Sequence, residues 1–213
     1  VAATVVGSTL AALDAVLAGD VASAYCLVRP PGHHATPVQA MGFCLFNHVA
    51  VAAAYARAKH GITRVAIVDF DVHHGNGTQD AFYSDPDVLY VSTHEYPFYP
   101  GSGAASEIGD GAGRGTTVNI PMPRGSGDAE HLRVFEEVVV PVVRRFRPEL
   151  ILVSAGFDAH FADDIAMQQL SVDGYGALTS VVTGLADELC DGRLLMAQEG
   201  GYHLVALPWC VRR

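Results

Sequence analysis

The sequence predicts an α/β fold of one domain, with a mainly parallel β-sheet and helices on both faces. Short, nearly continuous apolar runs alternate along the chain with longer segments that favour helix. Apolar runs of this kind are typical of strands that are covered on both sides, as in a parallel sheet. Regular alternation of strand and helix predicts a doubly wound arrangement. The length of 213 residues, half of them hydrophobic, suits a single domain with a sizeable core.

Six short segments are predicted to be strands. In chain order they are residues 24–28, 64–70, 88–93, 116–120, 150–154 and 193–197. The second of them, RVAIVDF, is the clearest, because it is apolar almost throughout and is bounded by Gly61 and Gly75. We therefore expect it at the centre of the sheet, covered on both faces.

Four longer segments between the strands are predicted to be helices. They are residues 2–17, 47–59, 128–146 and 172–189. Asn47 is a good N-cap residue, and Gly61 follows the end of the same helix. Pro141 should kink or interrupt the third helix, because proline lacks the backbone N–H that a helix interior needs.

Composition excludes several classes of function. The chain has 13 Lys and Arg against 23 Asp and Glu, a formal net charge of −10, which argues against a nucleic-acid-binding face. No apolar run is long enough to span a bilayer, so we expect no membrane partner. The cysteines lack C-x-x-C spacing and are expected to be reduced and mostly buried: Cys26, Cys44, Cys190 and Cys210. We see no secretory signal and expect a cytoplasmic protein.

Polar clusters follow five of the predicted strands. They read PGHH, DFDVHHGNG, THE, FDAH and QEGGY in chain order. The carboxyl ends of parallel strands meet at one edge of a sheet, and ligands bind there in α/β folds. The sequence therefore predicts a functional site that is rich in histidine and carboxylate at this edge.

The segment DFDVHH predicts a metal site. Because side chains alternate along an extended chain, Asp69, Asp71 and His73 should point the same way. Buried carboxylates without a partner are costly, and a bound cation removes that cost. Asp158, which ends another apolar strand, is the best candidate for a further protein ligand. Two Asp and one His suit zinc (Zn2+), and also Fe2+ or Co2+, so the identity of the metal stays open.

The histidine doublet in PPGHH predicts proton transfer beside this metal. Imidazole titrates near neutral pH, so His33 and His34 suit general acid–base chemistry. Each ring needs a partner that fixes its tautomer, and Asp69 and Asn76 are available for this role. Tyr202, in QEGGY, could donate a hydrogen bond to an oxyanion, although GGY alone is also typical of an ordinary turn.

Seven segments, taken together and in order, resemble the zinc-dependent histone deacetylase superfamily, with its bacterial histone deacetylase-like amidohydrolases and acetylpolyamine amidohydrolases. They are RPPGHHA (29–35), MGFCLFN (41–47), VDFDVHHGNGTQDAFY (68–83), YPGSG (99–103), NIPMPRGSGD (119–128), SAGFDAH (154–160) and QEGGY (198–202). The form DVHHGNGTQ is similar to the class II branch and its bacterial relatives. The resemblance implies an arginase/deacetylase-like fold with the active site at the carboxyl ends of the strands.

The resemblance also implies a role for each site residue. The metal ligands would be Asp71, His73 and Asp158. His34 would be the general base and acid, and His33 its electrostatic partner.

Further roles follow from the same resemblance. Asp69 would hold His33, and Asn76 would hold His34, although many relatives have Asp at the latter position. A carboxylate there would make the imidazole more basic than an amide does. Tyr202 matches the tyrosine that stabilises the transition state.

The resemblance extends to the substrate tunnel and to a second ion. Gly42 and Phe43 would form one wall, and Tyr99 would stand opposite, where the family usually has Phe. A structural potassium ion (K+) would use residues next to the active metal: Asp69, Asp71, His73 and Ser92, with the carbonyl of Thr93. The implied reaction is metal-assisted hydrolysis of an acetylated lysine side chain or an acetylated polyamine, which releases acetate.

The resemblance leaves alternatives open. The family normally has sequence before and after the matching region, including an acidic residue at the tunnel rim, so we expect residues 1–213 to be a catalytic domain that is truncated at both ends. An inactive or non-catalytic metal-binding fragment is therefore a second hypothesis. A dimanganese ureohydrolase of the related arginase fold would need a second Asp in an S-x-D-x-D pattern, and SAGFDAH offers only Asp158.

Overall fold

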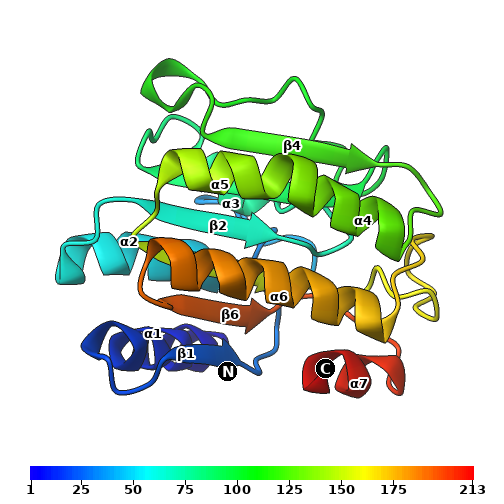
Figure 1. The fold of residues 1–213 in the computed structure, drawn as a ribbon, viewed down its shortest axis with the longest axis horizontal. Helices are drawn as coiled ribbons and strands as arrows, with labels where there is room; N and C mark the ends of the chain where they lie inside the picture. Colours follow the sequence, from blue (N-terminus) through cyan, green and yellow to red (C-terminus); the bar gives the residue numbers. More distant parts are fainter.

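A single six-stranded sheet, in which every strand pair is parallel, forms the centre of the computed structural model, which describes residues 1–213. The strands are β1 (Ser23–Cys26), β2 (Val65–Asp69), β3 (Val88–Glu95), β4 (Thr117–Met122), β5 (Leu150–Ala155) and β6 (Leu194–Gln198). Their order across the sheet is β1-β6-β5-β2-β3-β4 (Figure 1). The predicted parallel sheet is confirmed, and every predicted strand is present with ends that move by one or two residues.

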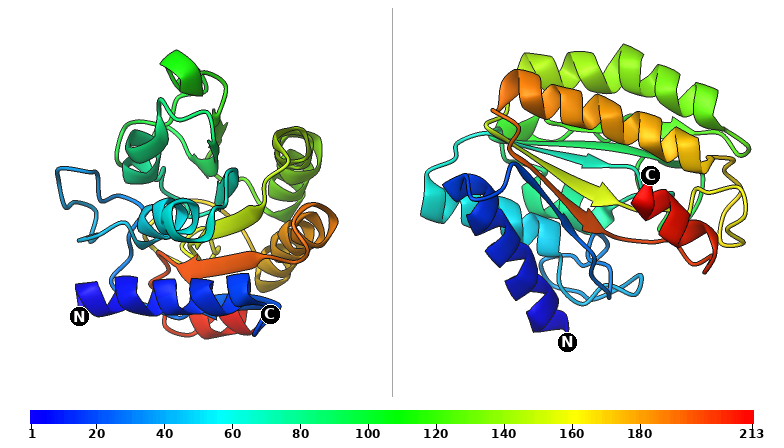
Figure 2. Two further views of the ribbon diagram at one scale, coloured as in Figure 1. Left: turned by 90° about the vertical axis from the view of Figure 1, so that its left-hand side faces the viewer. Right: turned by 60° about the horizontal axis from the view of Figure 1, so that its bottom comes forward.

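Helices cover both faces of the sheet (Figure 2). On one face lie α1 (Ala2–Ala18), α2 (His48–His60) and α3 (Asn76–Phe82). On the other face lie α4 (Asp128–Val134), α5 (Val140–Phe146) and α6 (Val172–Leu189), and α7 (Ala206–Arg212) packs against α6. Each face has its own hydrophobic core, and the two cores share the strands between them. Both predicted layers of helices are therefore confirmed.

The residues of β2 show why this strand is central. All five are buried: Ala66 and Val68 belong to the core under α6, and Val65 and Ile67 to the core under α2. A strand that is apolar on both faces gains burial from both layers, at roughly 25 cal/mol for each Å² of apolar surface. Asp69 is the last residue of β2, so the first polar side chain emerges where the strand ends.

The predicted helix 128–146 contains a local change of winding before Pro141. A π-helical stretch, Phe135–Val139, lies between α4 and α5. The wider turn gives room to the proline ring, which would clash with the carbonyl of the preceding turn in a regular α-helix. The chain therefore continues in the same direction instead of breaking.

Two short helices, α3 and α7, were not among the predicted elements. The first begins at the last two residues of the DVHHGNG motif, where Gly77 disfavours helix but allows a close approach: an added Cβ would lie 2.2 Å from the carbonyl oxygen of Ala35. The backbone N–H groups of Gly77 and Thr78 donate to the carbonyl of His33 at 3.0 and 3.2 Å. The start of α3 therefore fixes the loop after β1. The other short helix, α7, was not expected because it contains Pro208, but proline is tolerated in the first turn of a helix.

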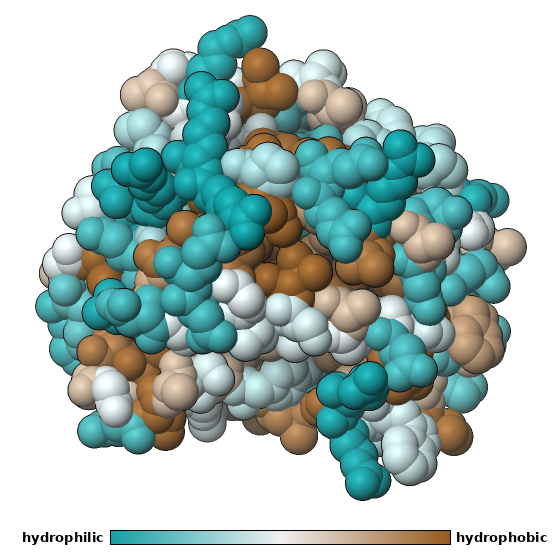
Figure 3. Space-filling view, viewed as in Figure 1, coloured by the Kyte–Doolittle hydropathy of each residue, from teal (hydrophilic) through white to brown (hydrophobic).

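The outer surface of α4, α5 and α6 is mixed in polarity. Figure 3 shows hydrophilic side chains projecting from this face, with hydrophobic surface in the creases between them. None of the helices combines the length and the apolar character that crossing a bilayer requires.

Candidate active site

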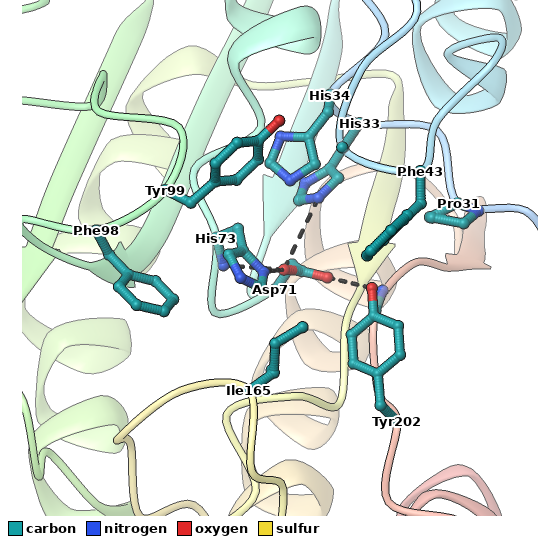
Figure 4. Close-up of a pocket in the computed structure, with 12 residues that line it drawn as sticks. Pro31, His33, His34, Phe43, Asp71, His73, Phe98, Tyr99, Ile165 and Tyr202 are labelled. Atoms are coloured by element: carbon teal, nitrogen blue, oxygen red, sulfur yellow. Dashed lines mark hydrogen bonds and ion pairs between the residues drawn. The ribbon is translucent and has the colours of Figure 1, made fainter.

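The loops that follow the parallel strands converge on one cavity of about 430 Å³. Figure 4 shows imidazole, carboxylate and phenol groups turned toward this space, with aromatic rings around it. The lining residues are Pro31, His33, His34, Gly42, Phe43, Asp71, His73, Phe98, Tyr99, Ile165, Gly200 and Tyr202. The predicted edge of the sheet is therefore where these groups meet.

Three predicted metal ligands come together beneath the cavity. One ligand atom each of Asp71, His73 and Asp158 lies within 4.8 Å of the other two. Nδ1 of His73 is 3.0 Å from Oδ1 of Asp71 and 3.2 Å from Oδ2 of Asp158. Both carboxylates are almost fully buried. Asp69, which the sequence placed on the same face, instead contacts His33.

The surroundings of the triad fit a divalent cation. Oδ2 of Asp158 is buried and accepts no well-aligned hydrogen bond, although Nδ1 of His73 lies nearby. Glycines let the backbone approach closely: an added Cβ at Gly200 would lie 2.1 Å from this oxygen, and one at Gly156 would lie 2.1 Å from Oδ2 of Asp71. Two carboxylates and one imidazole form a donor set that Zn2+ or Fe2+ accepts.

The charges in the triad also favour a cation. Burial raises the pKa of Asp158, and the neighbouring Asp71 raises it further. Burial would lower the pKa of His73, but Asp158 and Asp71 outweigh it and raise that pKa to about 10. The two carboxylates therefore stabilise positive charge at this point, whether it is a proton on His73 or a metal.

The first histidine of the doublet is held by Asp69, as predicted. Nδ1 of His33 lies 3.0 Å from Oδ2 of Asp69, and the same oxygen accepts a hydrogen bond from the Tyr90 hydroxyl. Oδ1 of Asp69 accepts the backbone N–H of Asp71 at 3.1 Å. One buried carboxylate thus orients the imidazole and the start of the metal-binding segment together.

The second histidine is held by Asn76, also as predicted. Nδ1 of His34 is 2.8 Å from Oδ1 of Asn76, whose amide nitrogen lies near the carbonyl of His34 and the sulfur of Met41. Because an amide oxygen only accepts, Nδ1 of His34 carries the proton and Nε2 is left as the acceptor. The two histidine rings have centroids 4.1 Å apart.

The two histidines differ in protonation. Burial would lower the pKa of His33, but the charges of Asp69 and Asp71 raise it well above the usual value. Burial, together with the neighbouring His33, lowers the pKa of His34 to about 3. Near neutral pH the first ring is therefore cationic and the second is neutral.

Tyr202 points its hydroxyl into the cavity, on the side where Asp71 lies (Figure 4). Its ring packs edge-on against Phe43 at 6.1 Å, and the guanidinium of Arg29 lies over it at 5.1 Å. Burial raises the pKa of Tyr202, so the phenol stays protonated and can donate a hydrogen bond. Its hydroxyl therefore lies in the same cavity as Asp71 and His73.

The mouth of the cavity is formed by the predicted tunnel residues. The turn 41–44 has positive φ at both central residues, 55° at Gly42 and 64° at Phe43. Glycine is required at the first position, because an added Cβ would lie 2.3 Å from the ring of His34. The turn presents Phe43 at 71% exposure. Tyr99 stands across the cavity, with its ring centroid 5.1 Å from that of His34.

The residues predicted to bind potassium lie at and just after the end of β2 and within the neighbouring strand β3. Asp69 and Ser92 are register partners. The hydroxyl of Ser92 pairs with His94, whereas the hydroxyl of Thr93 is buried without a hydrogen-bond partner.

Glu199 is a functional residue that sequence reasoning missed. It is fully buried, and its Oε2 accepts the backbone N–H groups of Gly32 at 2.6 Å and His33 at 3.1 Å. Its Oε1 accepts the hydroxyl of Ser154 at 3.1 Å. This carboxylate therefore ties the histidine loop to the end of β6. The sequence offered one signal for this residue, an acidic side chain directly after an apolar strand, within QEGGY.

Two apolar lining residues were also missed. The ring of Phe98 stacks on His73, with centroids 5.3 Å apart and planes 19° apart, and Ile165 lines the cavity from the loop after β5. Apolar residues in loops carry no chemical signal in a sequence, so only the structure could place them.

Comparison with known proteins identifies the family. The family model described as the histone deacetylase domain matches residues 1–213. The chain belongs to this family. This confirms the predicted family resemblance, and no ureohydrolase assignment is needed.

Named members of the histone deacetylase family are similar along most of the chain. Histone deacetylase 14, chloroplastic, from Arabidopsis thaliana is 50% identical over 94% of this chain and 49% of its own length. The histone deacetylase-like amidohydrolase of Pseudomonas aeruginosa is 47% identical over 96% of this chain and 54% of its own. The chain therefore spans about half the length of the curated relatives that it matches.

A solved structure confirms the fold. The crystal structure of an acetylpolyamine aminohydrolase from Burkholderia pseudomallei superimposes with a TM-score of 0.90 at 41% sequence identity. The match covers 98% of this chain and 59% of the other. The predicted deacetylase-like fold is therefore confirmed.

Proposed function

We propose that this chain hydrolyses an acetyl amide of a primary amine, in an acetyl-lysine side chain or an acetylated polyamine, with Zn2+ bound by Asp71, His73 and Asp158. The observation that carries the proposal is one cavity that combines this buried triad with a neutral imidazole and a protonated phenol. The names of an amidohydrolase and an acetylpolyamine aminohydrolase among the similar proteins support the same reaction.

In the proposed reaction, water adds to the acetyl carbonyl, the C–N bond breaks, and acetate and a free amine leave. A divalent metal at the triad would supply Lewis acidity and lower the pKa of bound water. His34 accepts the proton of the attacking water at Nε2, because its Nδ1 is engaged with Asn76. The same nitrogen then delivers this proton to the leaving amine.

The other polar groups act on charge rather than on protons. The positive charge of His33, held beside Asp69, stabilises negative charge that develops in the cavity. The hydroxyl of Tyr202 donates to the oxyanion of the tetrahedral intermediate, a kind of contact worth about 3–4 kcal/mol. A donor that is already in place costs no reorganisation when the charge appears.

The apolar walls support a substrate with an aliphatic arm. Phe43, Phe98 and Tyr99 place aromatic rings around the approach to the polar floor. A lysine side chain and a polyamine both consist of methylenes that end in an amide nitrogen. The net charge of −10 also favours cationic molecules.

Acetate release by the zinc-loaded chain tests the proposal, with an acetyl-lysine peptide and N-acetylputrescine as parallel substrates. We expect turnover of at least one of them. Tyr202→Phe should keep its zinc but lose roughly 100- to 1,000-fold in kcat. Folded, metal-loaded protein that turns over neither substrate would instead support a non-catalytic metal-binding domain.

The potassium site is a further part of the proposal. The pairing of Asp69 with Ser92 across β2 and β3 supports a cation among Asp69, Asp71, His73 and Ser92, with the carbonyl of Thr93 as a further ligand. Replacing K+ by Na+ or choline in the buffer, with thermal unfolding as the readout, tests this site independently of turnover.

A further inference from the structure

The carboxylate of Asp163 joins two loops of the site. Asp163 lies in the loop after β5, a few residues beyond Asp158, and is only 5% exposed. Its Oδ2 accepts the backbone N–H groups of Tyr202 at 2.6 Å and His203 at 3.0 Å. Its Oδ1 accepts the backbone N–H of Ile165 at 3.2 Å.

These bonds engage both oxygens of the carboxylate. Tyr202 and His203 donate their N–H groups to no other acceptor, and Asp163 pairs with no lysine, arginine or histidine side chain. Hydrogen bonds from N–H groups to a carboxylate are roughly twice as strong as those between neutral groups. The contacts of Asp163 are therefore with the backbone of two loops.

Before Tyr202, the segment is held at Gly200, which donates its N–H to Oδ2 of Asp71 at 2.7 Å and accepts the N–H of Phe157 at 3.1 Å. Fewer contacts hold the residues that follow. Tyr202 follows Gly201, whose φ of 117° is a conformation that glycine adopts readily because it has no Cβ. The next residues, Leu204 and Val205, are 85% and 66% exposed, so packing does not hold them. The ring itself packs against Phe43, which is also exposed, and lies under the guanidinium of Arg29.

We propose that Asp163 is a positioning residue for Tyr202, which sets the phenol against the metal-binding loop. The inference rests on the proposed function, since it assigns a role in placing the oxyanion donor. The same carboxylate holds Ile165, so one side chain places the donor and part of the wall. Catalytic groups must be held closely to their productive geometry, because a displacement of about 1 Å can cost about 100-fold in rate.

A double-mutant cycle on kcat tests the role of Asp163. Asp163→Ala should lower kcat at least about tenfold with KM changed less than about threefold, because only the transition state uses the phenol. In the Tyr202→Phe background, the same change should cost less than about threefold. Asp163→Asn, which keeps the size and one acceptor oxygen, should show a smaller loss.

The matched control is Asp164→Ala, which changes an exposed acid in the same loop and should keep the kcat of the parent. An equal loss from Asp163→Ala in both backgrounds would show a general structural effect and overturn the inference. If the alanine variant does not fold, the cycle with Asp163→Asn decides the question by the same criterion.

Backbone amide exchange separates this inference from the proposed function. In Asp163→Ala, the amides of Tyr202 and His203 should exchange at least about tenfold faster, while that of Val153 in β5 stays protected. Unchanged exchange at Tyr202 would overturn the inference even in an active enzyme. If the parent turns over no substrate, the proposed function fails and the exchange data alone decide whether Asp163 holds this segment.

Discussion

The floor and the mouth of the active-site cavity differ in how firmly their side chains are held. On the floor, Asp71 and Asp158 are 0% and 1% exposed, and each accepts a backbone N–H. At the mouth, Phe43 is 71% and Tyr99 is 44% exposed, and both make mainly ring contacts. The residues of the floor follow the ends of strands, whereas those of the mouth lie in turns. In the proposed function, the chemistry and the choice of substrate would therefore depend on different segments.

Removing one proposed metal ligand from the floor should give the largest effect on metal binding and on kcat. Asp158→Ala removes one of two buried carboxylates, so we expect zinc binding to be lost and kcat to fall on the order of 1,000-fold or more. Ligand binding stabilises the folded state, so the rise in Tm on adding zinc should also disappear. Metal analysis and thermal unfolding with and without zinc measure both effects.

The metal-free protein sharpens this test. Asp158→Ala also removes like charge beside Asp71, so the metal-free variant should unfold no more than a few degrees below the metal-free parent. Normal zinc content in the variant would refute the ligand role of Asp158. Asp164→Ala serves as the exposed control from the same loop.

A smaller effect is expected from replacing Glu199, which accepts hydrogen bonds from the backbone of the histidine loop. Glu199→Ala leaves the N–H groups of Gly32 and His33 buried without an acceptor, at about 1–3 kcal/mol each. At roughly 2–4 °C of Tm for each kcal/mol, unfolding should occur about 4–24 °C lower. We expect kcat to fall about 10- to 100-fold, because the backbone N–H of His33 loses the carboxylate that holds the loop in place.

Glu199→Gln is the matched variant. Its amide oxygen can still accept both N–H groups, and its NH2 can donate to the hydroxyl of Ser154, so Tm should stay close to that of the parent. Equal losses of Tm in the alanine and glutamine variants would show that charge, rather than hydrogen bonding, holds this loop.

Sequence could predict the floor because its chemistry depends on residue type and on position at strand ends. Asp71, His73 and Asp158 are recognisable as ligands, and the apolar strands before them place them at one edge. The contact of Glu199 with Gly32 spans 167 positions, so no local pattern reveals it. The same holds for Asp163, which reads as an ordinary loop acid until its contacts with Tyr202 are seen.

The missed parts of the fold have similar causes. Gly77 opposes helix by propensity, yet α3 forms because its N–H groups find the carbonyl of His33. At the mouth, Phe98 and Ile165 are apolar residues in loops, with neither periodicity nor chemistry to mark them. The proposed potassium site would include backbone oxygens, which a sequence does not display.

Replacing the hydrogen-bond partner of His34 should change the pH dependence of the rate while the metal ligands stay in place. Asn76→Asp adds negative charge next to the imidazole, which favours its protonated form and raises its pKa from about 3. The neutral base is then lost as pH falls, so kcat/KM should gain an acid limb between about pH 5 and 7 that the parent lacks. Above that limb, kcat should change less than about tenfold. An unchanged profile with full metal content would contradict the proposed role of His34.

Substitutions at the mouth should have the smallest effects, and they should change KM rather than kcat. Phe43→Ala removes an aromatic wall that is mostly exposed, so it should raise KM about three- to tenfold and leave kcat within about twofold. Tyr99→Phe, which deletes only a hydroxyl and keeps the ring, is the matched control and should leave both constants near those of the parent. Steady-state kinetics on an acetyl-lysine peptide and on N-acetylputrescine measure the effect for each substrate. A large loss of kcat in Phe43→Ala would mean that this ring also holds Tyr202, 6.1 Å away. In that case the mouth and the floor would not be independent, because the wall would share with Asp163 the task of placing the phenol.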